Sequence, residues 1–473
     1  MQIDFIKKLI KYLFVFMMVA VFTACQNKPK ELKADLWLTH SDGSVLFQKQ
    51  DRALIFKDSA QTQNPTIELD TTKTYQTMDG FGYTLTGGSA ILLNKLEESA
   101  RKALLQELFD TDSNNIGISY LRLSIGASDL SDTVFSYNDL PPNETDPELT
   151  KFTLERERKD LIPVLKEILA INPEIKILGS PWSPPTWMKT NNSSKGGSLK
   201  PEYFESYANY FVKYIQEMKK EGIVIDAITI QNEPLHPGNN PSLLMLAEDQ
   251  ALFIKQNLGP AFEKANIKTK IILYDHNADR IDYPISILDD PEAKKYVDGS
   301  AFHLYGGKIE ALSDVHKAHP DKHLYFTEQW VGAPSNFGGD LSWHIKTLII
   351  GAPRNWCRNV LEWNLASDPN QDPHTIGGCD RCLGAITIGG DEVTRNVAYY
   401  IIAHASKFVR PGSVRIESNL PEGLPNVAFK TPEGKKVLIV YNDGKSSQDF
   451  NIKYSGKSLA ASLKEGAVGT YVW

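Results

Sequence analysis

The sequence predicts an α/β protein: a (β/α)8 TIM barrel with a side β-sandwich domain built from N- and C-terminal strands. Three observations support this fold class. Short strand patterns recur between residues 78 and 364, helical patterns separate most of them, and strand patterns without helices flank this region on both sides. At 473 residues, the chain is long enough for a barrel and one small partner domain.

The barrel strands are expected at 78–83, 118–124, 175–180, 225–231, 270–275, 299–304, 323–327 and 360–364. The clearest helix is expected at 203–220, where Phe204, Tyr207 and Phe211 recur at helical spacing. Other helical stretches are expected at 89–109, 155–171, 242–264 and 341–350. A doubly wound open sheet is the competing fold, but the segment from Gly80 to Leu85 lacks the third glycine of a dinucleotide-binding turn.

The flanking strands are expected to form one β-sandwich, because neither terminal piece alone offers enough sheet to bury a core. The predicted organisation is a signal peptide at 1–24, a tether at 25–36, N-terminal sandwich strands at 37–75, the barrel at 76–408 and C-terminal sandwich strands at 409–473. The barrel is therefore inserted within the sequence of the sandwich.

The N-terminus has the pattern of a bacterial lipoprotein signal. Lys7, Lys8 and Lys11 precede an apolar run over 12–24 that is too short to span a bilayer comfortably. The run ends at Phe22-Thr23-Ala24-Cys25, which resembles a lipoprotein cleavage site with Cys25 as the lipidated residue. Because Phe22 replaces the usual leucine, ordinary secretion with an unmodified Cys25 is the alternative. We expect an exported protein, lipid-anchored to a bacterial membrane and either periplasmic or at the cell surface.

Charge and cysteine content exclude several classes of protein. Removing residues 1–24 changes the formal net charge from −7 to −9, and an acidic chain without a basic stripe argues against nucleic-acid binding. Besides Cys25, the chain has Cys357, Cys379 and Cys382. In an exported chain, Cys379-x-x-Cys382 favours a local disulfide over zinc, which would need two further ligands. We expect no metal and no organic cofactor, a monomer, and contact with a membrane only through the lipid.

Two glutamates close short apolar or β-branched runs. Glu233 follows the run 228–232, and Glu328 follows the run 324–327. Acidic residues are poor strand formers and costly to bury, so a carboxylate at the end of a strand needs a reason. A pair of them indicates acid/base chemistry on a bond held between them.

The other strand ends are polar and aromatic, and barrel active sites lie at these C-terminal ends. In chain order they present Arg122, Asp129, Trp182, Asn232, His236, Asp275, His276, His303, Tyr305, Trp363 and Asn364. Aromatic rings stack on the apolar faces of a pyranose, while amides and acids bind its hydroxyl groups. With the two glutamates, this set favours glycoside hydrolysis.

Each residue taken alone has a structural alternative. Trp182 and Trp363 could be core residues, and Arg122 could merely neutralise a buried acid. His303 could be a hydrogen-bonded wall residue, while His236, Asp275 and His276 could be polar loop residues; a metal site made from them lacks recognisable spacing. The conjunction of all these residues at one end of one barrel favours the sugar site.

Several segments between residues 78 and 413 together resemble glycoside hydrolase family 30, a family of clan A barrels with a side β-domain that includes glucosylceramidases and endo-β-1,6-glucanases. The segments are Gly80–Gly82, Leu121–Leu123, Ser128–Ser131, Ser180–Thr190, Gln231–Pro234, Phe302–Tyr305, Phe326–Glu328, Trp363–Leu365 and Ser406–Ser413. The stretches Ser-Pro-Trp-Ser-Pro-Pro and Asn-Glu-Pro together are quite specific.

The resemblance implies Glu233 as acid/base and Glu328 as nucleophile, with retention of configuration. It implies that Asn232 binds the sugar 2-hydroxyl group and that Asp129, Trp182, Tyr305 and Trp363 hold the sugar at the cleaved bond. We place Arg122 and His303 among the substrate-binding residues as well. We expect a raised pKa for Glu233, set by Glu328 and partial burial, and an ionised Glu328 supported by hydrogen bonds and Arg122.

The expected function is internal cleavage of β-1,6-glucan by a retaining, double-displacement mechanism. Gly377-Gly378-Cys379-Asp380-Arg381-Cys382 replaces the Gly-Gly-Pro-Asn of lysosomal-type members, and this stretch and 361–369 look more like the β-1,6-glucanase branch. The alternatives are a glucosylceramidase-like enzyme, an exo-acting β-glucosidase or β-xylosidase, and a glycan-binding lipoprotein without catalysis. The expected partner is a β-glucan polysaccharide or oligosaccharide.

Overall fold

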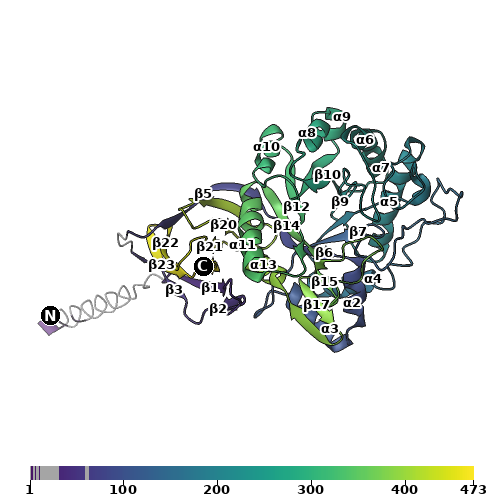
Figure 1. The fold of residues 1–473 in the computed structure, drawn as a ribbon. Coiled ribbons are helices and arrows are strands. Elements are labelled where there is room, and N and C mark those ends of the chain that lie inside the picture. Colours follow the sequence, from purple (N-terminus) through teal and green to yellow (C-terminus); the bar gives the residue numbers. More distant parts are fainter. Residues whose placement is uncertain (1, 4–5, 7–9, 11–30, 59–62) are drawn as a thin grey trace.

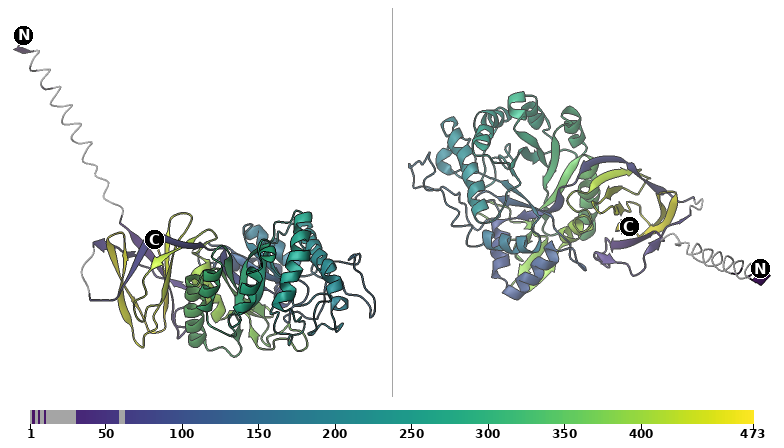
Figure 2. Two further views of the ribbon diagram at one scale, coloured as in Figure 1. Left: turned by 90° about the horizontal axis from the view of Figure 1, so that it is seen from above. Right: turned by 180° about the vertical axis from the view of Figure 1, so that it is seen from behind.

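A computed structural model of the protein describes residues 2–3, 6, 10, 31–58 and 63–473. It consists of a barrel surrounded by helices and a β-sandwich at one side (Figures 1 and 2). The expected fold class is therefore confirmed. Cys25 and the predicted signal peptide lie outside the described residues, apart from four isolated positions near the N-terminus.

The barrel is a closed ring of parallel strands in the order β10-β11-β12-β14-β6-β7-β8-β9. Their bounds are β6 (Gly80–Leu85), β7 (Tyr120–Ser124), β8 (Lys176–Ser180), β9 (Ala227–Thr229), β10 (Lys270–Asn277), β11 (Val297–His303), β12 (His323–Glu328) and β14 (Cys357–Asn364). Every residue of β6 and β7 is buried, as expected for parallel strands covered on both faces. The two strands approach so closely that a Cβ atom at Gly82 would lie 1.9 Å from the Tyr120 carbonyl oxygen.

The interior of the barrel is filled by side chains, so it is a packed core and not a pore. One interior layer contains Tyr120, Leu178, Ala227, Ile272, Ala301, Tyr325 and Leu361, one residue from each of seven strands. A filled interior leaves the two ends of the barrel as places for a site, and the C-terminal end is the one that TIM-barrel enzymes use.

Helices cover the outside of the barrel (Figure 1). They are α2 (Gly87–Lys95), α3 (Glu98–Phe109), α4 (Leu161–Ile171), α5 (Phe204–Lys220), α6 (Ala247–Phe253), α7 (Gly259–Lys264), α8 (Asp282–Leu288), α9 (Pro291–Lys294), α10 (Ala311–Ala318), α11 (Phe337–His344), α12 (Ala352–Arg354) and α13 (Val397–Ser406). Short 3-10 turns η1 (Thr186–Met188) and η2 (Pro201–Tyr203) and π-helical segments η3 (Ile254–Leu258) and η4 (Ile345–Gly351) accompany them.

The structure corrects three of the expected helices. The stretch 89–109 is two helices, because Leu96 and Glu97 adopt extended backbone angles and separate α2 from α3. The stretch 155–171 is helical only from Leu161. The stretch 242–264 becomes helical only at Ala247, since the backbone N–H groups of Ser242 and Leu244 donate to Ser194 and Gly197 instead.

The sandwich joins the two ends of the chain in one eleven-stranded sheet system. Its N-terminal strands are β1 (Lys33–Thr39), β2 (Gln48–Lys49), β3 (Leu54–Ile55), β4 (Lys57–Asp58) and β5 (Thr66–Thr77). Its C-terminal strands are β19 (Val414–Ser418), β20 (Asn426–Lys430), β21 (Lys436–Tyr441), β22 (Gln448–Tyr454), β23 (Lys457–Leu463) and β24 (Val468–Val472). β1 pairs with β24, and β5 pairs with β19 and β22, so both termini build one domain.

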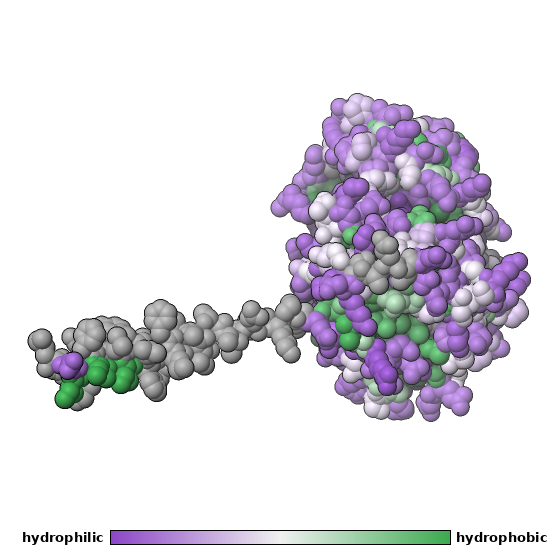
Figure 3. Space-filling view, turned by 90° about the vertical axis from the view of Figure 1, so that its left-hand side faces the viewer, coloured by the Kyte–Doolittle hydropathy of each residue, from purple (hydrophilic) through white to green (hydrophobic). Residues whose placement is uncertain are grey.

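Two details at the sandwich differ from the expected boundaries. β1 begins at Lys33, so residues 33–36 belong to the sandwich and not to a tether, because Ala34 and Leu36 face its core. β5 extends to Thr77, past the expected start of the barrel at residue 76. On the face seen in Figure 3, hydrophilic residues surround a patch of hydrophobic ones in the lower half of the view.

The main core runs without interruption from the barrel into the sandwich. It includes helix α13 and strand residues such as Val427, Phe429 and Ile439.

Two small sheets lie outside the barrel and the sandwich. One pairs β13 (Val331–Gly332) with β16 (Cys382–Leu383), and the other joins β15 (Ala366–Ser367), β17 (Ile386–Gly389) and β18 (Glu392–Arg395).

Among the described residues, no helix combines the length and apolarity needed to cross a membrane.

Candidate active site

The candidate site lies at the C-terminal end of the barrel, where the strands bring distant residues together. Glu328 is the last residue of β12, and His303 is the last residue of β11. Asn232 and Glu233 follow β9, and Trp363 lies at the end of β14. The parallel direction of all these strands is the reason that their ends meet at one mouth.

Glu233 has an unusual backbone conformation. Its φ angle is +46°, in the left-handed region that costs a non-glycine residue free energy, and its N–H donates to the Asp275 carbonyl oxygen at 2.9 Å. Such strain persists where surrounding contacts hold it, and it is found at functional sites. The conformation turns the Glu233 side chain into the mouth of the barrel instead of along the strand direction.

Arg122 is an ion-pairing side chain at the centre of the site. Its Nη1 atom donates to Glu328 Oε2 at 2.6 Å, and its Nη2 atom donates to Asn232 Oδ1 and Asp275 Oδ2 at 2.7 Å each. The side chain is completely buried. The planar guanidinium thus holds three acceptors in fixed positions, which a lysine could not do.

Asp275 is fully buried and has donors on both oxygens. Oδ2 accepts from Arg122, Ser180 and Thr229, and Oδ1 accepts from Thr327 at 2.6 Å and faces His303 Nε2 at 3.1 Å. These contacts hold the pKa of Asp275 well below its usual range against the effect of burial. Asp275 lies within β10, as its expected place in the strand 270–275 predicts, and it connects Arg122 to His303; the alternative of a polar loop residue is wrong.

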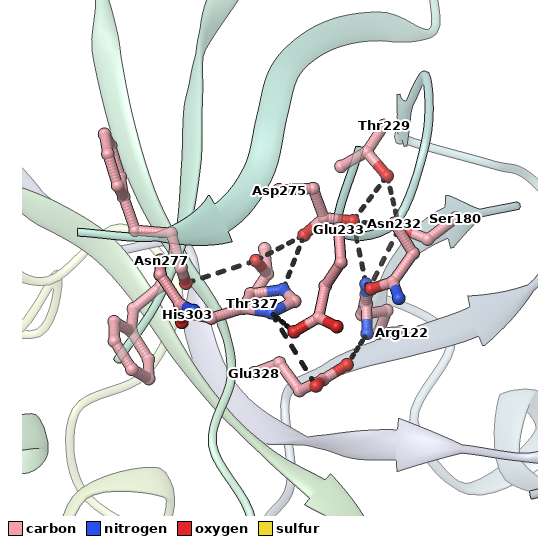
Figure 4. A network of polar contacts seen from close by, with 12 residues as sticks. Arg122, Ser180, Thr229, Asn232, Glu233, Asp275, Asn277, His303, Thr327 and Glu328 are labelled. Carbon is pink, nitrogen blue, oxygen red and sulfur yellow. Dashed lines mark hydrogen bonds and ion pairs between the residues drawn. The ribbon is translucent and has the colours of Figure 1, made fainter. Parts of the chain in front are cut away.

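His303 bridges the two acidic parts of the site. Its Nδ1 atom lies 3.1 Å from Glu233 Oε1 and 3.7 Å from Glu328 Oε1, while Nε2 faces Asp275. In Figure 4 the two glutamate carboxyl groups lie between His303 on one side and Arg122 on the other. Burial opposes a charge on His303, but Glu328, Asp275 and Glu233 outweigh it and raise the pKa of His303 to about 9.

The pKa expected for Glu233 is wrong for the site without substrate. Burial raises the pKa of Glu233, but the hydrogen bond and the positive charge of His303 outweigh burial and lower it. Burial raises the pKa of Glu328, and His303 and Arg122 oppose that rise. The sequence argument omitted His303, which lies beside Glu233 only in the folded chain.

The two glutamates are close enough to act on one bond. One carboxylate oxygen of Glu233 and one of Glu328 lie within 4.8 Å of each other. Retaining glycosidases hold their carboxyl groups about 5–5.5 Å apart, whereas inverting enzymes need about 6.5–9.5 Å to admit water. The observed approach fits the retaining arrangement.

A cavity of about 320 Å³ opens above the two glutamates. Its lining combines carboxylates, amides, imidazoles and aromatic rings: Asp129, Trp182, Asn232, Glu233, His236, Asn239, His276, Asn277, Tyr305, Glu328, Trp330, Trp363, Cys379 and Cys382. Pockets of this size and mixed polarity are typical of small-molecule sites.

Most of the residues predicted to bind substrate line this cavity. Trp182 and Trp363 stack on each other with ring centroids 5.3 Å apart, and the Arg122 guanidinium lies 4.7 Å from the Trp182 ring. The Tyr305 hydroxyl donates to Glu328 Oε1 at 2.9 Å. Burial and the charges of Glu328 and Glu233 raise the pKa of Asp129 to about 7.

Two predicted substrate-binding residues lie elsewhere. Arg122 and His303 have no exposed surface and are absent from the cavity lining. Their expected contact with substrate stays a prediction; in the structure they contact Asn232, Glu233 and Glu328, which line the cavity. Their contacts make them supports for Asn232, Glu233 and Glu328.

The cavity also contains residues that were not predicted to bind substrate. His236 and His276 were placed at the strand ends, with polar loop residues as the alternative, and Asn239, Asn277 and Trp330 were not considered. His276 is buried on β10, and its Nδ1 atom has no hydrogen-bond partner among the described residues. Trp330 comes two residues after Glu328. An aromatic residue so soon after a strand-end carboxylate was the signal that could have placed Trp330 at the site.

The cysteines differ in their surroundings. Cys379 and Cys382 are joined by a disulfide at the rim of the cavity, whereas Cys357 is a buried free thiol on β14.

Within the part of the chain that the structure describes, one group of three side chains has ligand atoms close enough together to bind a metal ion: Glu233, His303 and Glu328. Hydrogen bonds and ion pairs already account for these three side chains: Glu233 contacts His303, His303 contacts Asp275, and Glu328 contacts Arg122 and Tyr305.

Comparison with known protein families gives matches over nearly the whole described chain. The profile of the glycosyl hydrolase family 30 TIM-barrel domain matches residues 78–409. The profile of the glycosyl hydrolase family 30 beta sandwich domain matches residues 412–471.

Two kinds of enzyme are among the relatives. An endo-1,6-beta-D-glucanase of Neurospora crassa is 35% identical over 407 residues, covering 81% of this chain and 82% of that protein. The lysosomal acid glucosylceramidase of Mus musculus is 30% identical over 440 residues, covering 86% of this chain and 83% of that protein. The solved structure of an endo-beta1,6-glucanase superimposes with a TM-score of 0.86 at 35% identity, covering 93% of this chain and 99% of that one.

Proposed function

The chain belongs to glycosyl hydrolase family 30, and on that premise we propose that it is a retaining endo-β-1,6-glucanase. The observation that carries the chemistry is the approach of the Glu233 and Glu328 carboxyl groups at the mouth of the barrel. The linkage is supported by the glucanase relatives at 35% identity in sequence and in structure.

In the proposed first step, Glu328 attacks the anomeric carbon while Glu233 protonates the departing glycosidic oxygen. The C–O bond to the leaving sugar breaks, an ester bond to Glu328 forms, and the proton from Glu233 ends on the released hydroxyl group. In the second step, Glu233 takes a proton from water, whose oxygen attacks the same carbon and releases Glu328. Two inversions give net retention of configuration.

The surrounding contacts support these roles. Arg122 and Tyr305 hold both oxygens of Glu328, which fixes the attacking group and favours its ionised form. Asn232 receives a hydrogen bond from Arg122, so its amide group is oriented toward the sugar next to Glu328. Asp129, Trp182 and Trp363 form the wall that holds this sugar, while His236 and His276 lie on the Glu233 side, with the leaving group.

A second candidate is a glucosylceramidase-like activity, which the relatives at 30% identity favour. Incubation with β-1,6-, β-1,3- and β-1,4-glucans and glucosylceramide, followed by chromatography, separates the two. The proposal predicts mixed-length oligosaccharides from β-1,6-glucan and little hydrolysis of the others. Release of glucose from glucosylceramide alone, or binding of β-1,6-glucan without cleavage, would contradict it.

We also propose export and anchoring through a lipid on Cys25, as the signal pattern indicates. The test is the mass of the N-terminal peptide and fractionation of cells that express wild type or Cys25→Ser. The proposal predicts a lipid mass on Cys25 and loss of membrane association in the variant. An unmodified Cys25, or a variant that stays with the membrane, would contradict it.

Size-exclusion chromatography with light scattering tests the expected monomer.

A further inference from the structure

The disulfide at the cavity rim ends at two residues with different environments. Cys382 is firmly held: it pairs with Gly332 between β16 and β13, its carbonyl oxygen accepts from Asn364 Nδ2 at 3.2 Å, and its side chain packs with Trp182 and Trp363. Cys379 lies in the connection between β15 and β16 and packs on the edge of the same cluster. The bridge therefore ties a residue of a connecting segment to one fixed in a sheet.

The segment before Cys379 lies directly on Asp129. The Thr375 N–H donates to the Asp129 carbonyl oxygen at 2.8 Å, and a Cβ atom at Gly378 would lie 2.4 Å from that oxygen. The backbone N–H of Cys379 acts on the Asp129 carboxyl group and lowers its pKa, against the rise that burial causes. The backbone of Asp129 is thus held by Thr375, its carboxyl group faces the backbone of Cys379, and the disulfide fixes the far end of this segment.

Global stabilisation is a weak explanation for such a bridge. Cys379 and Cys382 are separated by only two residues, and the chain-entropy effect of a disulfide is smallest for the shortest loops. A bridge that adds little to overall stability, lines the cavity and closes a segment in contact with Asp129 has a local effect on the site.

We propose that the Cys379–Cys382 disulfide positions Asp129 for sugar binding, so that its reduction weakens the enzyme's hold on the substrate. The inference rests on the proposed function, in which Asp129 binds the sugar at the cleaved bond. Reduction by a dithiol proceeds by attack of a thiolate on one sulfur of the bridge and then release of the other. The protein ends with two thiols and the reductant with one disulfide.

The kinetic test compares oxidised and dithiol-treated wild type, the Cys379→Ser/Cys382→Ser variant, Asp129→Asn, and the triple variant on β-1,6-glucan. Loss of one hydrogen bond to a charged group corresponds to about a tenfold effect, so reduction or double substitution should raise KM about tenfold with a smaller change in kcat. In the Asp129→Asn background the same changes should have less than about a twofold effect, because coupled residues are not additive. The dithiol should not affect the double serine variant.

Three results would overturn the proposal: unchanged KM after complete reduction, an undiminished effect in the Asp129→Asn background, or a dithiol effect on the double serine variant. The last would point to Cys357. Thermal unfolding of each variant separates a loss of stability from a loss of binding.

A wild type that hydrolyses no glycan would refute the proposed function, and amide hydrogen exchange then still tests the disulfide. Reduction should accelerate exchange at residues 375–379 and at 127–131 around Asp129. Acceleration confined to 375–379 would overturn the positioning role.

Discussion

His303 Nδ1 lies 3.1 Å from Glu233 Oε1, so the imidazole and the carboxyl group form one hydrogen-bonded unit. At neutral pH the unit holds one transferable proton, on His303, because the pKa of His303 is raised to about 9 and that of Glu233 is lowered. Transfer of this proton from Nδ1 to Oε1 gives a neutral imidazole and the protonated Glu233 that general-acid catalysis requires.

This unit predicts the alkaline limb of the pH–rate profile. The required proton is present below the raised pKa of the unit and is lost as pH rises through about 9, so kcat/KM should fall there. In His303→Gln, the imidazole that holds the proton up to about pH 9 is gone, and Glu233 keeps burial, which raises its pKa, and the charges of His276 and His236, which lower it, so the alkaline limb should move to lower pH. The matched control is His344→Gln, since His344 forms a buried pair with Glu362 outside the cavity. An alkaline limb that does not move in His303→Gln would contradict this role.

Substitution of the two glutamates should have different consequences. Glu328→Ala should abolish turnover of every glycoside, because no nucleophile remains. Glu233→Ala should lower turnover of β-1,6-glucan by about 10²–10⁴-fold, the usual contribution of a general acid. Its first step should be nearly normal with an aryl glycoside whose leaving group needs no proton, and added azide should then yield a β-glycosyl azide. Azide rescue that gives an α-glycosyl azide, or equal losses with both substrates, would disprove the assignment.

Arg122 should be needed for both activity and stability. Arg122→Met removes one partner of two buried ion pairs, those with Asp275 and Glu328, which typically costs about 3–5 kcal/mol. Arg122→Lys keeps a charge but cannot reach Glu328, Asn232 and Asp275 together, so it should recover stability more than kcat. Urea unfolding and steady-state kinetics measure the two effects. Wild-type kcat in Arg122→Met would show that the position of Glu328 does not depend on this ion pair.

Glu157 predicts a pH dependence of stability away from the site. It is buried and accepts from the Tyr137 hydroxyl at 2.9 Å, and burial raises its pKa to about 7. The folded state therefore binds this proton more tightly than the unfolded state, and the contribution to stability is lost as pH rises from about 4.5 through 7. Glu157→Gln should stabilise the protein at pH 8, by roughly 1–3 kcal/mol, and have little effect at pH 4. Equal effects at both pH values in urea unfolding would contradict the shift.

Much of the fold could be predicted because barrel strands are apolar on both faces. Runs such as those of β7 and β10 are short, rich in residues that favour strands, and separated by helices. The order of these runs alone places Glu233 and Glu328 at the same end of the barrel. The break between α2 and α3 could not be predicted, since Leu96 and Glu97 are both compatible with a helix.

The site could be predicted less completely, because its electrostatics depend on neighbours far apart in the chain. His303 is 70 residues from Glu233, and nothing local to Glu233 shows that a cation will lower its pKa. Asp275 was expected at the end of a strand, but nothing local to it shows that it has five polar partners within the barrel. The contact of Cys379 with Asp129 likewise exists only after folding.

The most direct test of the account is the anomeric configuration of the first products from β-1,6-glucan, followed by proton NMR before mutarotation. A retaining endo-glucanase predicts oligosaccharides of mixed length whose new reducing ends appear first as the β-anomer. Initial release of the α-anomer would contradict the double displacement through Glu328, and glucose as the sole early product would contradict internal cleavage.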